Sequence, residues 1–159
     1  FRLDNFDAAL WQKLLTEAQA RKRALVAQPI FGSDISQDQV ERARQNLAAA
    51  DMHECVRLER ADLLLRSPPA AEGVLVANPP YGIRLEEQEG LAAFYPKLGD
   101  ALKQRFAGWR CYFISADPQL PRLIGLKASR RTPLFNGALE CRLLEYRIIA
   151  GPMRRTKPA

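Results

Sequence analysis

The stretch that decides the fold is Val74-Leu75-Val76-Ala77-Asn78-Pro79-Pro80-Tyr81-Gly82. Four small or branched apolar residues run into an amide, two prolines, an aromatic ring and a glycine. The apolar run has the length and composition of a buried strand in a parallel sheet. The prolines cannot continue it, because each lacks a backbone N–H and has a fixed φ. The strand is therefore expected to stop at Asn78, in a stiff loop at the edge where open α/β sheets bind ligands.

This loop carries groups suited to a planar exocyclic amino group, whose lone pair is delocalised into a base. The side-chain oxygen of Asn78 and the main-chain carbonyl of Pro79 can accept hydrogen bonds from the two N–H groups of such an amino group and orient its lone pair. Pro79 and Pro80 would hold these acceptors rigidly, which suits catalysis by positioning. Tyr81 offers a face on which the base can stack. The structural alternative is a proline-stiffened loop with an aromatic anchor.

Strands and helices are predicted to alternate on both sides of this stretch. A helix capped by Asp7 precedes a strand over residues 29–34, a helix entered through Ser36, and a strand running to Asp62. An acidic loop over residues 83–90 leads to a helix over 91–106 and a strand over 111–115, and Asp117-Pro118 begins a short helix. Two strand-like runs, 127–135 and 138–149, flank Asn136-Gly137, a strong hairpin signal. The pattern predicts a doubly wound α/β domain with a terminal antiparallel addition.

Two carboxylates end predicted strands in positions that suit a nucleoside. Asp34 can accept hydrogen bonds from both hydroxyls of a ribose. Asp62 can accept from an adenine amino group. The alternatives are that Asp34 only caps the next helix and that Asp62 is a solvated turn residue.

The composition of the chain limits its binding partners, its metal and disulfide content and its location. The 159 residues carry a formal net charge of +6, which permits a polyanionic partner or a solvated basic surface. The three widely spaced cysteines and the isolated His53 favour free thiols over disulfides and give no metal site. No apolar run has the length of a membrane span and no signal peptide is present. Free thiols suit the cytoplasm, which is the expected location.

Three motifs resemble the bacterial guanine-N2 methyltransferases of large-subunit (23S) ribosomal RNA. They cover residues 31–35 (FGSDI), 78–84 (NPPYGIR) and 134–141 (LFNGALEC). The resemblance is closest to the N-terminal methyltransferase half of the bifunctional K/L enzymes. It implies a Rossmann-like, S-adenosylmethionine-dependent fold with a C-terminal antiparallel hairpin. It also implies an upstream RNA-binding THUMP domain and, in many members, a second methyltransferase downstream.

The resemblance implies roles for individual residues. Asp34 would hold the cofactor ribose, Ile35 would pack on the adenine, and Asp62 would lie near the adenine amino group. Asn78 would contact both the cofactor and the target nitrogen, with Pro79, Pro80 and Tyr81 completing the catalytic segment. Candidate phosphate contacts, with surface solvation as the alternative, are Arg84, Lys127, Arg130 and Arg131.

One departure from the family is large. The family's first strand, with an acidic glycine-rich cofactor loop, has no counterpart in this sequence and is expected just before Phe1. That strand would lie between those ending at Asp34 and Asn78, so the two halves of the sheet would lack a partner. Residues 1–150 are therefore predicted to be a partial methyltransferase domain and 151–159 a flexible basic tail or linker. The chain alone is expected to bind the cofactor weakly or not at all, and to be inactive.

Three other functions remain open. The same tetrapeptide serves N6-adenine methylation of DNA and N5-glutamine methylation of protein. From a different class, the chain could be a non-catalytic RNA-binding fragment.

Overall fold

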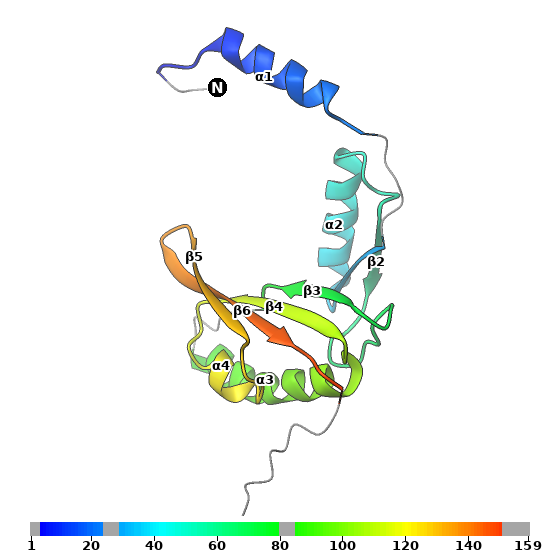
Figure 1. The fold of residues 1–159 in the computed structure, drawn as a ribbon, viewed down its shortest axis with the longest axis vertical. Helices are drawn as coiled ribbons and strands as arrows, with labels where there is room; N and C mark the ends of the chain where they lie inside the picture. The colour runs from blue at the N-terminus through cyan, green and yellow to red at the C-terminus, as the bar shows by residue number, and fades with distance from the viewer. Residues whose placement is uncertain (1–3, 24–28, 80–84, 151–159) are drawn as a thin grey trace, which may run out of the picture. The chain divides into compact units, whose positions relative to one another are not determined.

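The computed structural model describes residues 4–23, 29–79 and 85–150, and of residues 85–89 it describes the backbone only. By their contacts these residues form two compact units. The first comprises residues 1–32 and 41–58, and the second residues 33–40 and 59–159. Figure 1 shows the elements in chain order.

The N-terminal helix α1 covers Ala8–Ala20, as predicted. The Asp7 side chain accepts a hydrogen bond from the Leu10 amide at 2.9 Å, which confirms the predicted cap. None of its residues is buried, and the expected apolar face, with Leu10, Trp11 and Leu14, is exposed. The helix is thus confirmed by its cap, while its apolar face covers no core.

Strands β1 (Ile30–Asp34) and β2 (Val56–Arg60) pair in a two-stranded sheet, and helix α2 (Gln37–Ala49) connects them. Val40 is the buried residue of this helix. Both strands and the helix lie where the sequence predicts them. They form the β–α–β part of the expected α/β pattern.

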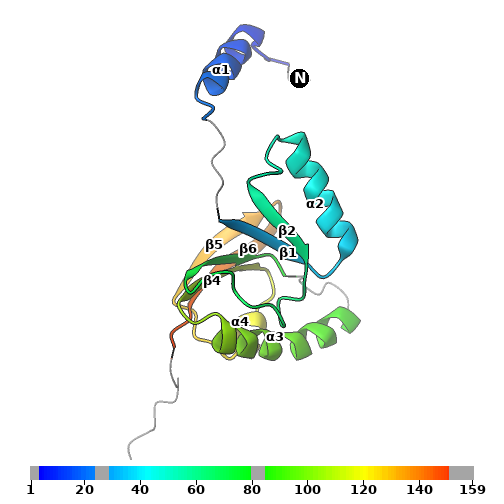
Figure 2. The same cartoon turned by 90° about the vertical axis from the view of Figure 1, so that its right-hand side faces the viewer.

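A second sheet has the order β3-β4-β6-β5. Strands β3 (Gly73–Ala77) and β4 (Trp109–Ser115) are parallel, whereas β6 (Leu139–Arg147) runs antiparallel to both β4 and β5 (Arg130–Asn136). Helices α3 (Leu85–Arg105) and α4 (Leu120–Leu123) lie on one side of this sheet (Figure 2). The core between them includes Tyr95, Leu98 and Leu102 of α3 and Phe113 and Tyr146 of the sheet.

Strand β3 is half-buried, so the prediction of a fully buried strand is wrong. Leu75 and Ala77 pack against the core, whereas Val74 and Val76 are 60% and 66% exposed. Side chains alternate between the two faces of a strand, and both described helices of this unit cover the same face. The opposite face of β3 is therefore open.

Trp109 fastens the segment that leads into β3. Its indole N–H donates to the Ala70 carbonyl at 3.0 Å, and its ring meets Phe106 edge-on at 5.6 Å. The Arg105 guanidinium donates to the Leu64 carbonyl in the same segment. The segment after β2 is thereby held against the end of α3 and the start of β4.

Two predicted helix starts are wrong. Helix α3 begins at Leu85, so the acidic stretch expected as a loop is helical, which suits the helix propensity of glutamate and the favourable dipole at a helix start. Helix α4 begins at Leu120 with Gln119 as its N-cap, two residues later than expected. The Asp117 carboxylate instead accepts bonds from the Gln119 amide and the Tyr95 hydroxyl, both at 2.8 Å.

The predicted hairpin is confirmed, with one refinement. Asn136 pairs with Leu139, so the two-residue turn is Gly137-Ala138. Gly137 has a φ of +61°. A glycine with positive φ in the first central position is the pattern of a type II′ turn, which matches the twist of the flanking strands.

Strands β1 and β3 are not paired, and the described strands form two separate sheets. This arrangement agrees with the expectation that the halves ending at Asp34 and Asn78 lack a strand between them. The mixed α/β fold is as predicted.

Candidate functional site

The predicted catalytic segment begins directly after β3. This strand ends at Ala77, and Asn78 and Pro79 follow without regular structure. Ala77 pairs with Phe113 of β4, so Asn78 stands at the carboxyl end of two parallel strands. Asn78 is exposed and Pro79 is half-buried. Pro80 and Tyr81 lie outside the described residues.

Asp34 ends β1 and is exposed. Its Oδ1 atom accepts a hydrogen bond from the Ser36 amide at 2.8 Å, which shapes the turn into α2. The helix-entry role that was the alternative is thus present. It uses one carboxylate oxygen, and among the described residues the other has no hydrogen-bond partner, so a ribose hydroxyl can still donate to it.

Asp62 follows β2 and is half-buried. Its Oδ1 atom accepts from the Leu64 amide at 2.8 Å, and its carbonyl accepts from the amides of Leu65 and Arg66. Asp62 therefore lies in a turn, as the alternative interpretation of this residue predicts. Its second carboxylate oxygen has no partner in the part of the chain that the structure describes.

The structure brings the three predicted cofactor residues of β1 and β2 to one end of the two-stranded sheet. The Ala61 amide donates to the Asp34 carbonyl at 3.0 Å, and the Arg60 guanidinium donates to the Ile35 carbonyl at 3.0 Å. Ile35 presents an apolar side chain that is 65% exposed. Two carboxylates and one open apolar surface fit a nucleoside, because hydroxyl and amino groups donate and a base stacks. Asn78 instead follows β3 of the other sheet.

The predicted RNA-contacting residues separate into three groups. Lys127 and Arg130 are exposed at the start of the hairpin. Arg131 is exposed and lines a cavity between the hairpin and α4. Arg84 lies outside the described residues.

Buried ionisable groups of the core are held neutral. Burial raises the pKa of Tyr95, and its hydrogen bond to Asp117 raises that pKa further. Burial also raises the pKa of the Cys111 thiol to about 12 and that of Tyr146 to about 12, although the Arg131 charge lowers the latter. These groups therefore remain protonated near neutral pH and do not act as bases.

The three cysteines form no disulfide, and the histidine lies at the surface. Cys55, Cys111 and Cys141 are free thiols, as expected. His53 is exposed in a turn and lies 4.0 Å from Glu54. Among the described residues, no group of three or more His, Cys, Asp or Glu side chains could hold a metal ion.

Comparison with known proteins identifies the family. The sequence profile of the family described as "RMKL-like, methyltransferase domain" matches residues 3–145. This chain belongs to that family. The RMKL-like assignment confirms the predicted resemblance to ribosomal RNA methyltransferases of the K/L type.

Two curated relatives of this RMKL-like chain illustrate the match. A provisionally named RNA methyltransferase of Synechocystis sp. is 40% identical over 144 residues, which are 91% of this chain and 38% of that protein. A ribosomal RNA large subunit methyltransferase K/L of Shewanella sp. is 39% identical over 155 residues, or 96% of this chain and 22% of that protein. The chain thus spans about a fifth to two fifths of the length of these relatives.

Solved structures confirm the fold. SMU.472, a provisionally assigned methyltransferase crystallised with SAH, has a TM-score of 0.77 and 25% identity, covering 95% of this chain and 39% of the other. A Listeria monocytogenes protein, named by prediction as an N6-adenine-specific DNA methylase, has a TM-score of 0.74 and 26% identity, covering 91% and 37%. At the level of the RMKL-like family, the comparisons bear out the predicted fold, enzyme class and cofactor.

No described helix is both long enough and apolar enough to cross a bilayer.

The sequence did not indicate the cavity that Arg131 lines. Its volume is about 530 Å³, and it gathers residues from the end of β4, from α4 and from the hairpin. Two further arginines, Arg122 and Arg142, line it as well. The period-two spacing of Glu140, Arg142 and Leu144 was visible in the sequence, but it shows only a shared strand face and not the cavity opposite.

Proposed function

We propose that this chain is part of the methyltransferase domain of an S-adenosylmethionine-dependent RNA methyltransferase. Its substrate is the exocyclic N2 amino group of a guanine in large-subunit ribosomal RNA. The observation that carries the proposal is the family match over residues 3–145, with 39% identity to a large-subunit K/L enzyme. The position of Asn78 and Pro79 at the carboxyl end of β3 supports it.

The chemistry requires alignment more than a strong base. S-adenosylmethionine supplies an activated methyl group when it is bound. The Asn78 side-chain oxygen and the Pro79 carbonyl accept hydrogen bonds from the two N–H groups of the guanine amino group and orient its lone pair. Pro80 stiffens the segment, and Tyr81 stacks on a base flipped out of its helix.

The cofactor side of the site is built by the end of the two-stranded sheet. Asp34 accepts from the ribose hydroxyls, Ile35 covers the adenine, and Asp62 accepts from its amino group. Asn78 contributes from the other sheet. The second carboxylate oxygens of Asp34 and Asp62, which have no partner among the described residues, support these roles.

We further propose that the chain works inside a longer cytoplasmic enzyme. Residues 1–150 form a partial methyltransferase domain and 151–159 a linker. The first strand of the domain lies upstream, after an RNA-binding THUMP-type domain, and a second methyltransferase follows. The 22% share of the K/L relative and the separation of the two sheets support this proposal.

Asn78→Ala in the full-length protein tests the catalytic assignment. Methyl transfer to unmodified large-subunit RNA should fall about 10²-fold or more, because the target nitrogen loses its alignment. RNA binding should change far less, because phosphate contacts supply most of the affinity for RNA. Asn46→Ala, the same substitution at an exposed position of α2, is the matched control and should leave both unchanged. Methylation that survives in Asn78→Ala would reject the catalytic role.

The same assay separates the other candidate functions. The Listeria likeness favours N6-adenine methylation of DNA as the second candidate. Parallel RNA, DNA and glutamine-containing protein substrates distinguish guanine N2, adenine N6 and glutamine N5 as methyl acceptors. A wild-type protein that binds RNA and methylates none of them would instead be a non-catalytic RNA-binding protein.

A further inference from the structure

A charged cavity lies at the carboxyl end of β4, on the face of the four-stranded sheet that α3 and α4 cover. Its floor is the segment from Ser115 to Pro118, and one wall is the short helix α4 with Pro121 and Arg122. The opposite wall is the hairpin, which contributes Arg131, Glu140, Arg142 and Leu144.

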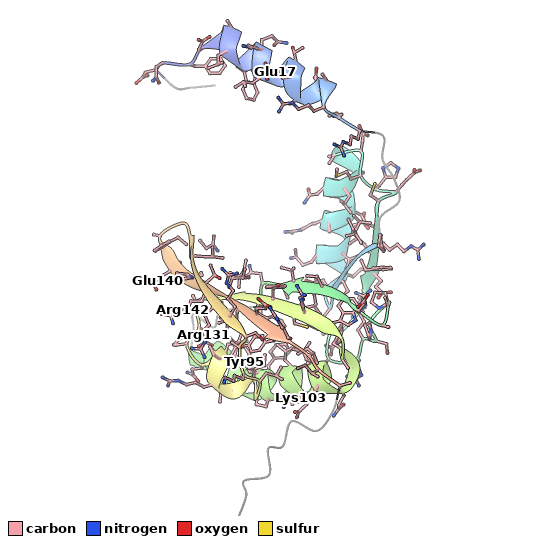
Figure 3. All side chains as sticks on the ribbon, viewed as in Figure 1. Glu17, Tyr95, Lys103, Arg131, Glu140 and Arg142 are labelled. Atoms are coloured by element: carbon pink, nitrogen blue, oxygen red, sulfur yellow. The ribbon has the colours of Figure 1, made fainter. Side chains whose placement is uncertain are left out.

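Strand alternation explains why this wall is charged. Tyr146, Leu144, Arg142 and Glu140 share one face of β6, because they are spaced by two residues. The first two are buried in the core, whereas Arg142 and Glu140 lie beyond it and are exposed. Arg131 pairs with Leu144 across the hairpin and so joins the same face. Figure 3 labels Arg131, Arg142 and Glu140 along the hairpin.

Three arginines and two acids line this cavity, so its lining carries a formal charge of +1. The Asp117 carboxylate already accepts from the Tyr95 hydroxyl and the Gln119 amide. Glu140 lies 3.9 Å from Arg142, a long and exposed contact that contributes little. Neither Arg122 nor Arg131 has an ion pair with any described residue. Two guanidinium groups therefore remain available to an anion.

The cavity lies next to the proposed target site in the sheet. Ala77 of β3 pairs with Phe113 of β4 in parallel register. Continuing this register places Pro79 level with Ser115, which begins the floor of the cavity. A strand of nucleic acid whose base reaches Asn78 would thus pass close to these arginines.

We propose that this cavity binds a backbone phosphate of the RNA, beside the nucleotide that is methylated. Arginine suits this ligand, because its planar guanidinium donates two parallel hydrogen bonds to phosphate oxygens. The identity of the RNA rests on the proposed function, but the phosphodiester contact rests on the cavity itself. The contact positions the strand and carries no sequence information.

The test measures binding without methylation. Fluorescence anisotropy of the full-length protein would use a labelled single-stranded RNA from the unmodified large-subunit sequence and the DNA of the same sequence. Arg131→Gln and Arg122→Gln should each weaken RNA binding about tenfold, the loss of one charge-assisted contact. Each should also lower the salt dependence of log K by about 0.7 per phosphate contact. Glu140→Gln should strengthen binding, because it removes a negative charge from the cavity wall.

Arg110→Gln is the matched control. Arg110 is exposed near the opposite end of the same strand β4 and is not among the residues that line the cavity. The proposal is overturned if Arg110→Gln weakens binding as much as Arg131→Gln, or if only DNA binding responds. Equal losses for RNA and DNA support a phosphodiester site.

Failure of the proposed function is distinguishable from failure of this site. Asn78→Ala should lose far more methyl transfer than RNA affinity, whereas Arg131→Gln should lose RNA affinity. If the wild type binds RNA through these arginines but methylates no RNA, the phosphate site stands and the methylation proposal falls. If methylation is observed and Arg131→Gln binds RNA as tightly as the wild type, the phosphate site falls alone.

Discussion

Two tyrosines of the same core differ in the state of their hydroxyl groups. The Tyr95 hydroxyl donates to the Asp117 carboxylate at 2.8 Å. The Tyr146 hydroxyl is buried and has no partner among the described residues. Removing a satisfied donor and removing an unsatisfied one should therefore have different consequences.

We predict that Tyr95→Phe lowers the free energy of unfolding by about 1.5 to 3 kcal/mol, the contribution of a hydrogen bond to a charged group. Tyr146→Phe should be neutral or slightly stabilising, because the desolvated hydroxyl contributes no hydrogen bond. Urea unfolding of the two variants, each followed by circular dichroism, measures the difference. Equal losses would contradict the assigned hydrogen bonding.

At this scale the sequence identified residues whose role follows from their place in the chain. Asp34, Asp62 and Asn78 could be proposed as candidates because each comes at the end of a predicted strand. Arg122 and Arg142 could not, because their proximity depends on the packing of α4 against the hairpin. The hydrogen bond between Tyr95 and Asp117 likewise joins positions 22 residues apart.

The contact between α3 and α4 depends on a glycine. A Cβ atom added to Gly99 would lie 1.7 Å from the Ile124 carbonyl oxygen, next to the end of α4. A Cβ atom at Gly90, on the same helix α3, would meet no described atom within 4 Å. Alanine has a higher helix propensity than glycine at both positions, but only Gly90 has space for its methyl group. Comparing the two substitutions therefore separates the effect of propensity from the effect of crowding.

We predict that Gly99→Ala lowers the free energy of unfolding by about 1 to 3 kcal/mol, because the backbones of α3 and α4 must move apart. Gly90→Ala, its matched control, should raise it by about 0.5 to 1 kcal/mol. Thermal unfolding of both variants gives the signs. Stabilisation by Gly99→Ala would show that the two helices are not in close contact.

Local patterns predicted most of the elements and missed two boundaries. Strands and the hairpin follow from apolar runs, prolines and the glycine of the turn, all of which act within a few residues. The start of α4 does not, since the Asp117 carboxylate accepts hydrogen bonds from the Gln119 amide and the Tyr95 hydroxyl, and Gln119 becomes the N-cap. The open face of β3 depends on which elements cover the sheet, and four apolar residues cannot specify that.

For the whole molecule, the separation of the two sheets bears on cofactor binding. The residues proposed for the nucleoside lie on the sheet of β1 and β2, and Asn78 follows the sheet of β3 to β6. No described strand pairs with both sheets. A binding site that draws on both would need a further segment to fix their spacing.

We therefore predict that this chain alone gives no measurable heat on titration with S-adenosylmethionine, whereas the full-length protein binds it. Asp34→Asn in the full-length protein should weaken that binding, because a carboxamide is a poorer acceptor for two ribose hydroxyls. Isothermal titration calorimetry compares the three proteins. Micromolar or tighter binding by the isolated chain would sink the proposal of a separate first strand.

Trp109, whose indole holds the segment before β3 in place, can also serve as a fluorescence probe. The chain has two tryptophans. Trp11 lies in the first unit and is 42% exposed, while Trp109 lies in the second and is 8% exposed. Trp11→Phe would leave a single fluorophore that emits from an apolar site, and Trp109→Phe would leave one in contact with water. Each unit therefore carries its own intrinsic fluorescence reporter, and their melting can be followed separately without an added label.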